Sequence, residues 1–162
     1  MGDRRPDIGF IPTPPNVVDT MLQLAQLQPD DVVYDLGSGD GRILIAAAQR
    51  YGVRGVGIDI DRDRIQDATH QAQLAGVDHL IQFRQQDLYE TDFQEATVVI
   101  LYLLPHLNLK LRPALLAQLQ PGDRILSHDF DLGDWEPDAV AQVAIEAGEV
   151  ATVYRWRLTA TL

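Results

Sequence analysis

The chain has no cysteine among its 162 residues, which excludes disulfides and cysteine-ligated metal sites. It also has no apolar run as long as a membrane span, and its first residues lack the apolar core of a signal peptide. We therefore expect a cytoplasmic protein that does not enter a membrane. The four histidines are scattered along the sequence, so we expect no metal site.

Basic residues are also scarce. Lysine and arginine number 13 against 24 acidic residues, which gives a formal net charge of −11. Because nucleic-acid binding usually needs a basic face, we expect no nucleic-acid partner. The charge is compatible with a cationic cofactor or a basic protein substrate, and equally with a solvated acidic surface. The length and a hydrophobic content of 46% predict one globular domain over residues 1–162.

The most informative stretch is residues 32–44, where an apolar run ends in Asp35, passes through alternate glycines and enters an alanine-rich helical pattern. This pattern predicts a strand, a tight turn and a helix start, the place where open α/β sheets bind ligands. Glycines leave the backbone accessible to a ligand, and the first amides of the helix can bind an anionic group.

Two ligand classes compete for this turn. A dinucleotide fingerprint has the spacing Gly-x-Gly-x-x-Gly, whereas this turn has Gly-x-Gly-x-Gly and acidic residues on both sides, Asp35 and Asp40. Those carboxylates would repel a pyrophosphate but suit S-adenosylmethionine, which carries an ammonium, a sulfonium and one carboxylate. Residues 35–41 (Asp-Leu-Gly-Ser-Gly-Asp-Gly) resemble motif I of the class I, seven-stranded S-adenosylmethionine-dependent methyltransferases.

The resemblance implies a set of cofactor-binding residues. Asp59 ends the second expected strand, where a carboxylate can accept both ribose hydroxyls, and the family has an acidic residue at that place. Asp87 and Leu88 match by position the residues that contact adenine. The candidate cofactor residues are Asp35, Gly37, Ser38, Gly39, Asp40, Gly41, Asp59, Ile60, Asp87, Leu88 and Tyr102.

On the acceptor side, Tyr102 follows the fourth expected strand, where class I enzymes commonly line the acceptor pocket. The Asn/Asp-Pro-Pro-Tyr/Phe motif of amino-group DNA methyltransferases is absent from this place. His128 and Asp129 end the fifth strand, within a polar and aromatic stretch over residues 127–135. We expect catalytic roles for Tyr102, His128 and Asp129. For His128 two interpretations stay open, orienting a substrate or bonding to the backbone.

Residues 10–14 (Phe-Ile-Pro-Thr-Pro) together with residues 35–42 resemble a group of small bacterial methyltransferases. More distantly, the chain is similar to the mitochondrial lysine methyltransferases that act on the ATP synthase c-ring protein and on the adenine nucleotide translocase. This resemblance implies methyl transfer, with protein lysine as the favoured acceptor. The alternatives are a small-molecule methyltransferase, a non-catalytic S-adenosylmethionine-binding module and a nicotinamide-binding domain.

The fold expected from the pattern and the resemblance is α/β, a Rossmann-like doubly wound sheet of seven strands, mostly parallel with a C-terminal β-hairpin. An N-terminal arm over residues 1–13 precedes a helix over residues 14–27 capped by Thr13. Two interpretations of Phe10 in this arm stay open, a residue that covers the cofactor or a hydrophobic staple of the helix. Later helices are expected at 42–51, 62–75 and 107–119, with Asp61 as the cap of the second of them and Pro113 predicting a restart or kink in the third. The expected strands are residues 32–36, 53–59, 80–84, 96–102, 124–128, 140–145 and 150–158.

Overall fold

The computed structural model describes residues 12–160, so most of the expected N-terminal arm, including Phe10, lies outside the described residues. The helices are α1 (Pro15–Ala25), α2 (Arg42–Tyr51), α3 (Arg62–Leu74) and α4 (Pro105–Gln118), with short 3₁₀ turns η1 (Leu88–Glu90) and η2 (Glu146–Gly148). The strands are β1 (Val32–Leu36), β2 (Arg54–Asp59), β3 (Ile81–Gln85), β4 (Val98–Leu101), β5 (Arg124–His128), β6 (Ala139–Ala144) and β7 (Val150–Arg157). Among residues 12–160, no helix is long and apolar enough to cross a membrane.

All seven strands form one sheet in the order β3-β2-β1-β4-β5-β7-β6. The first five are parallel, while β7 runs antiparallel to both β5 and β6, which confirms the mostly parallel sheet with a C-terminal hairpin. The strand order reverses between β1 and β4. A crevice opens at such a switch point, beyond the carboxyl ends of the strands.

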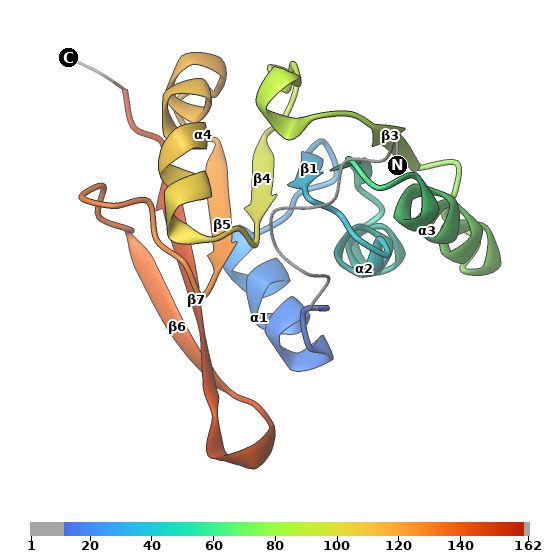
Figure 1. Ribbon diagram of the computed structural model, residues 1–162, viewed down its shortest axis with the longest axis horizontal. Helices are drawn as coiled ribbons and strands as arrows, with labels where there is room; N and C mark the ends of the chain where they lie inside the picture. The colour runs from blue at the N-terminus through green and yellow to red at the C-terminus, as the bar shows by residue number, and fades with distance from the viewer. Residues whose placement is uncertain (1–11, 161–162) are drawn as a thin grey trace, which may run out of the picture.

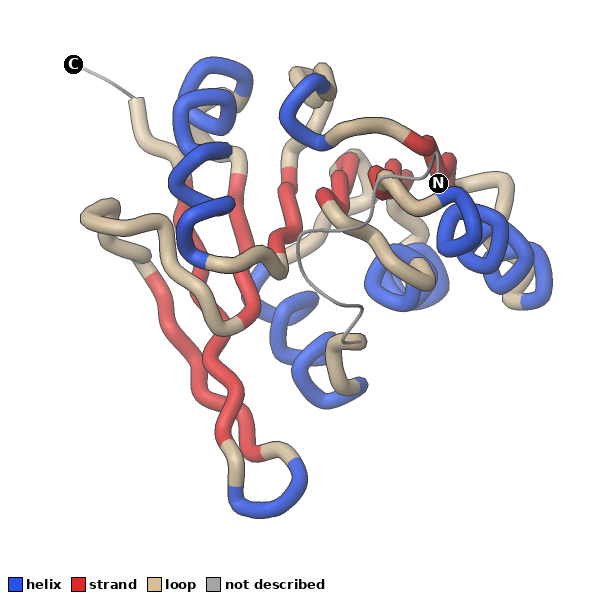
Figure 2. The backbone as a smooth tube through the Cα atoms, viewed as in Figure 1, coloured by secondary structure: helices blue, strands red, loops and turns tan. Residues whose placement is uncertain are grey.

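Helices cover the two faces of the sheet unequally (Figures 1 and 2). Helices α1 and α2 and part of α3 pack on one face, where Met21, Leu44 and Ile100 belong to the same buried cluster. On the other face α4 is the main cover, and Leu111 and Trp156 are buried there. The connection from β5 to β6 contains no helix. Its loop over residues 129–138 instead packs Leu132 and Trp135 on this second face.

Several element boundaries follow from local chemistry. Gly52 is the C-cap of helix α2; its positive φ of 67° is easy for glycine, and its amide donates to the carbonyl of Ala48. The Asp61 side chain caps α3 by accepting hydrogen bonds from the amides of Asp63 and Arg64, as expected for this residue type. Helix α2 and strand β5 have the expected bounds.

One expectation about a helix is wrong, and so is one half of another. Thr13 does not cap α1; the N-cap is Pro14, which has no side-chain hydrogen bond, and the hydroxyl of Thr13 faces His128 instead. Helix α4 begins at Pro105 and continues through Pro113 as one helix, so the chain does not restart there. Pro113 lies on the exposed side of α4, where water can hydrogen-bond the carbonyl that lacks a helical donor.

Candidate functional site

The register of the sheet brings three candidate residues together. Leu36 pairs with Leu101, which in turn pairs with Ser127. The next residue of each segment, Gly37, Tyr102 and His128, therefore reaches the carboxyl edge at the same level on three neighbouring strands. Residues 37, 102 and 128, far apart in the sequence, thus form one site beside the switch point.

The glycine loop is folded tightly against the end of β2. The amides of Gly37 and Ser38 both donate to the carbonyl of Ile58, at 2.7 and 2.9 Å. Gly37, Gly39 and Gly41 have φ values of 95°, 57° and 80°, which L side chains rarely adopt. A Cβ atom on Gly41 would also lie 2.7 Å from the ring of Phe83. The loop conformation therefore requires glycine.

Two buried carboxylates lie beneath this loop. Asp59 is 7% exposed; its Oδ2 accepts from the amide of Gly39 and its Oδ1 from the amide of Asp61, each at 2.9 Å. A carboxylate has about four lone-pair sites, so Asp59 can still accept two ligand hydroxyls. Burial raises the pKa of Asp35 well above its usual value, and the charges of Asp59 and Asp40 raise it further. The site therefore favours a cationic ligand, which would relieve this repulsion.

The carboxylate of Asp40 forms an ion pair with Arg42. The guanidinium of Arg42 contacts the Asp40 carboxylate at 2.6 Å and donates to the carbonyl of Thr13 at 3.2 Å. Arg42 thus joins the glycine loop to the segment before α1. This makes the direct cofactor contact expected of Asp40 a weaker candidate than that of Asp59.

The segment after β3 lies next to the same carboxylates. The amide of Gln86 donates to the carbonyl of Asp59 at 3.1 Å, which brings Asp87 to this side of the site. Asp87 caps η1 by accepting a hydrogen bond from the amide of Tyr89. Ile60 and Leu88 are half-buried. The structure therefore places all the expected cofactor residues around the ends of β1 to β4.

On the other side of Gly37 the site is aromatic. The rings of Tyr102 and His128 stack with centroids 3.9 Å apart, and Phe130 lies 6.1 Å from Tyr102 with nearly parallel planes. Burial, followed by the charge of Asp129, raises the pKa of Tyr102, so its hydroxyl stays protonated at neutral pH. We name Tyr102, His128 and Phe130 the aromatic wall.

His128 forms the buried layer of this wall. It is 2% exposed, and its Nδ1 lies 3.2 Å from the hydroxyl of Thr13 while its Nε2 lies 3.5 Å from the Asp129 carboxylate. Within residues 12–160 both ring nitrogens of His128 face side chains, so the structure gives no support there to the interpretation that this histidine bonds to the backbone. Burial lowers the pKa of His128, while the Asp129 carboxylate partly offsets this, so the ring favours the neutral form.

Asp129 has the backbone geometry of a turn. Its φ is 66°, uncommon for a residue other than glycine, and its backbone and carboxylate bond to the backbone of Thr152 on β7. The carboxylate is partly exposed beside the buried His128. The structure therefore brings together all three residues with expected catalytic roles.

Three residues of the site were missed in the sequence. The sequence pattern predicts a capping role for Thr13 and a helix start at Arg42, and it indicates no role for Phe130 within the polar and aromatic stretch. Only for Phe130 did the sequence carry a signal, an aromatic residue two positions after a candidate histidine. The contacts of Thr13 and Arg42 depend on residues 115 and 29 positions away in the chain.

Comparison with known proteins agrees with this geometry. The profile of the ANTKMT methyltransferase domain family matches residues 35–139. A protein-lysine N-methyltransferase from Saccharolobus islandicus is 41% identical over 139 residues, which cover 85% of this chain and 86% of that protein. The mouse adenine nucleotide translocase lysine N-methyltransferase is 34% identical over 76% of this chain, and the match spans only 53% of its length.

Among solved structures, one described as an RNA methyltransferase from Salinibacter ruber in complex with S-adenosyl-L-homocysteine is 55% identical to this chain. The match covers 94% of this chain and 96% of that one, with a TM-score of 0.86. The names of these relatives agree on methyl transfer and differ on the acceptor.

Proposed function

The chain belongs to the ANTKMT methyltransferase domain family and is an S-adenosylmethionine-dependent methyltransferase, and from this premise we propose that its acceptor is the ε-amino group of a lysine in a protein. The observation that carries the proposal is the 41% identity to a protein-lysine N-methyltransferase over 85% of the chain, a match that covers both the glycine loop and the strand ends of the aromatic wall. We further propose that residues 1–162 act as one domain.

The residues around the glycine loop fit S-adenosylmethionine. We propose that Gly37, Gly39 and Gly41 accommodate its methionine part, because glycines offer backbone without a side chain, and that Ser38 contributes its backbone to the same loop. Asp59 accepts the ribose hydroxyls, and Asp87 and Leu88 hold the adenine. Asp35 supplies negative charge beneath the cationic groups. Ile60 lines the ribose side, while Asp40 holds the loop through Arg42.

The bound cofactor supplies a methyl group already activated by a sulfonium, so the protein mainly has to align the acceptor. A lysine has a reference pKa of about 10.4 and must lose a proton to solvent before its nitrogen can attack the methyl carbon. The N–C bond then forms as the S–C bond breaks, and S-adenosylhomocysteine is the leaving group. The aromatic wall lowers that pKa by excluding water, and the Tyr102 hydroxyl accepts a hydrogen bond from the amine. The partly exposed Asp129 attracts the lysine before it is deprotonated, and the buried His128 supports the Tyr102 ring.

The electrostatics beside the wall also support a basic acceptor. The loop after β5 contains no lysine or arginine and carries the acidic residues Asp129, Asp131, Asp134, Glu136 and Asp138. Arg112 pairs with Asp134 and Arg155 with Asp138, which leaves most of the negative charge nearest the wall on Asp129 and Asp131. A lysine-containing segment complements this charge, whereas a phosphate backbone is repelled by it.

RNA is the second candidate acceptor, because the Salinibacter ruber protein at 55% identity is described as an RNA methyltransferase. Labelled S-adenosylmethionine separates the two candidates. The enzyme is incubated with a cell lysate, which is then divided and treated with protease or ribonuclease. We expect label that protease removes, recovered as methyllysine after hydrolysis, and less label with Asp59→Ala at a limiting concentration of S-adenosylmethionine. Label that only ribonuclease removes would replace protein by RNA as the acceptor.

A further inference from the structure

Asn108 is a polar residue enclosed in the apolar cover of the second face. It lies in the first turn of α4 with 0% exposure, next to the buried Leu107 and on the same side as Leu111. Burying an amide group is costly unless it is hydrogen-bonded. Its Nδ2 donates to the carbonyls of Phe130 and Asp131, at 3.3 and 3.0 Å.

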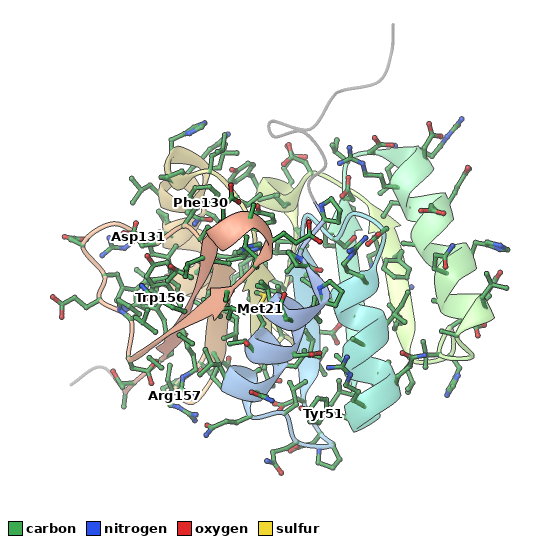
Figure 3. All side chains as sticks on the ribbon, turned by 90° about the horizontal axis from the view of Figure 1, so that it is seen from below. Met21, Tyr51, Phe130, Asp131, Trp156 and Arg157 are labelled. Atoms are coloured by element: carbon green, nitrogen blue, oxygen red, sulfur yellow. The ribbon has the colours of Figure 1, made fainter. Side chains whose placement is uncertain are left out.

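Helix α4 holds the following loop at three successive carbonyls. Asn108 binds those of Phe130 and Asp131, and Arg112, one turn later on the same face, donates to that of Leu132 at 3.1 Å. Arg112 also pairs with Asp134 and lies over the ring of Trp135. The two side chains therefore divide the loop: Asn108 holds the end nearest the site, and Arg112 holds the end nearest Trp135. Figure 3 labels Phe130 and Asp131 at the first of these ends.

The end that Asn108 holds carries part of the aromatic wall. Phe130 lies beside Tyr102, and its carbonyl accepts a second hydrogen bond from the hydroxyl of Ser127. Helix α4 itself starts three residues after Tyr102, and the amide of Asn108 bonds to the carbonyl of Leu104. One side chain thus joins the segment that carries Tyr102 to the segment that carries Phe130.

We propose that Asn108 is a positioning residue, which fixes Phe130 beside Tyr102 and so sets the width of the aromatic wall that receives the acceptor. The inference rests on the proposed placement of the acceptor at Tyr102. Asn108 does not touch the cofactor side, because its contacts lie on α4 and on the loop after β5. Its loss should therefore affect use of the acceptor and leave cofactor binding intact.

The test compares Asn108→Leu, which keeps the number and branching of side-chain heavy atoms and removes the amide, with Arg112→Met, which releases the same loop at its other end. Loss of one such hydrogen-bonding group corresponds to about a tenfold change in rate. For Asn108→Leu we expect kcat/KM for poly-L-lysine to fall by about that factor, with unchanged affinity for S-adenosylhomocysteine. For Arg112→Met we expect unchanged kcat/KM per folded molecule, even if its melting temperature falls more than that of Asn108→Leu.

Chymotrypsin gives a readout that does not depend on the acceptor. Asn108→Leu should accelerate cleavage of the native protein after Phe130, and Arg112→Met should accelerate it after Trp135. If Asn108→Leu does not fold, Asn108→Ala replaces it, since it removes the same donor and adds no bulk to the buried site. The same changes in kcat/KM and in cleavage after Phe130 are expected.

Three outcomes would overturn the inference: unchanged kcat/KM in both Asn108 variants, a parallel loss of cofactor affinity, or an equal loss in Arg112→Met. A wild type that methylates total RNA but not poly-L-lysine contradicts the proposed lysine acceptor, and the same kinetic comparison is then made with RNA. If neither substrate is methylated, the cleavage pattern decides. Cleavage after Phe130 that is no faster in the Asn108 variants than in Arg112→Met shows that Asn108 does not position the wall.

Discussion

Asp35 shows how a single residue can be costly to the empty site and useful to the occupied one. It is 4% exposed, and burial together with Asp59 and Asp40 raises its pKa. The folded protein therefore holds a proton on Asp35 at pH values where the unfolded chain has lost it. Its contribution to the free energy of unfolding is greatest below the ordinary pKa of 3.8 and decreases as the pH rises through the folded-state value.

We therefore predict that Asp35→Asn makes the cofactor-free protein more stable at neutral pH and weakens its affinity for S-adenosylmethionine. The amide removes the buried charge, and with it the charge that favours a cationic ligand. Thermal melts from pH 4 to pH 8 and calorimetric titration would measure both effects. A variant that is less stable than the wild type at neutral pH would contradict the role assigned to the raised pKa.

A second prediction at this scale concerns Asp59→Ala, which should weaken cofactor binding by roughly 1–3 kcal/mol, the cost of leaving the partners of a charged hydrogen bond unpaired. Asp61→Ala is the matched control, because it removes the cap of α3 and costs about 1 kcal/mol of stability without touching the ribose site. Calorimetry should separate the two variants. Equal affinities would place the ribose contact elsewhere.

Tyr102 provides the third prediction. Tyr102→Ala, or loss of His128 and Asp129 together, should lower methyl transfer much more than cofactor affinity, because these groups lie on the acceptor side of Gly37. Tyr102→Phe keeps the ring stacked on His128 and removes only the hydroxyl, so it isolates the hydrogen bond to the amine. Kinetics, cofactor titration and melts are compared for each variant. If activity falls only in proportion to the loss of folded protein, these residues have a structural role and do not act on the acceptor.

At the scale of elements, helix α4 covers the sheet and also holds the loop after β5, and its sequence pattern indicates only the first of these roles. Its buried face carries Leu111 and Leu115 against the sheet, and the same face carries Asn108 to the loop after β5. Pro113 occupies the exposed side of the helix. The apolar pattern identifies the helix, whereas its contacts with the loop depend on where residues 129–135 return in space.

Because α4 continues through Pro113, that residue should cost stability. Pro is about 3 kcal/mol less favourable than Ala within a helix, so we predict that Pro113→Ala raises the free energy of unfolding by up to about that amount. Denaturant unfolding measures the change, and kcat/KM should stay the same. A variant of lower stability would show that the proline ring contributes packing or restricts the unfolded chain more than it weakens the helix.

At the scale of the molecule, segments from both ends of the chain meet around the site. Thr13 contacts His128, and β7 pairs with β5 up to His128. At the opposite edge, the buried pair of Arg124 and Asp31 joins β5 to the turn before β1. The position of the site therefore depends on contacts between segments that are far apart in the chain.

Ligand binding should accordingly stabilise the whole molecule. At 100 times its dissociation constant, S-adenosylhomocysteine should add about 2.7 kcal/mol to the free energy of unfolding. For a domain of this size that corresponds to a rise of several degrees in the melting temperature. Scanning calorimetry checks this, with NAD as the control ligand expected to have no effect. A rise in the melting temperature with NAD and not with S-adenosylhomocysteine would favour the nicotinamide-binding alternative instead.

The sequence by itself determined the parts of this protein that rest on local rules. Glycines 37, 39 and 41 mark a turn that needs positive φ, Asp61 caps a helix, and the periodicity of residues 42–51 and 124–128 defines α2 and β5. The family resemblance then supplied the sheet and the position of Asp59. These features depend on residues within a few positions of one another, or on a motif with fixed spacing.

Only the tertiary structure decided how the acceptor side is built. The stacking of Tyr102 on His128, the contact of Thr13 with His128, and the hold of Asn108 on Phe130 join segments between 22 and 115 residues apart. Thr13 satisfies the local pattern of a helix cap, yet its hydroxyl faces a histidine that only the sheet register brings near. Local preferences are worth about 1 kcal/mol, so a buried partner supplied by the fold can override them.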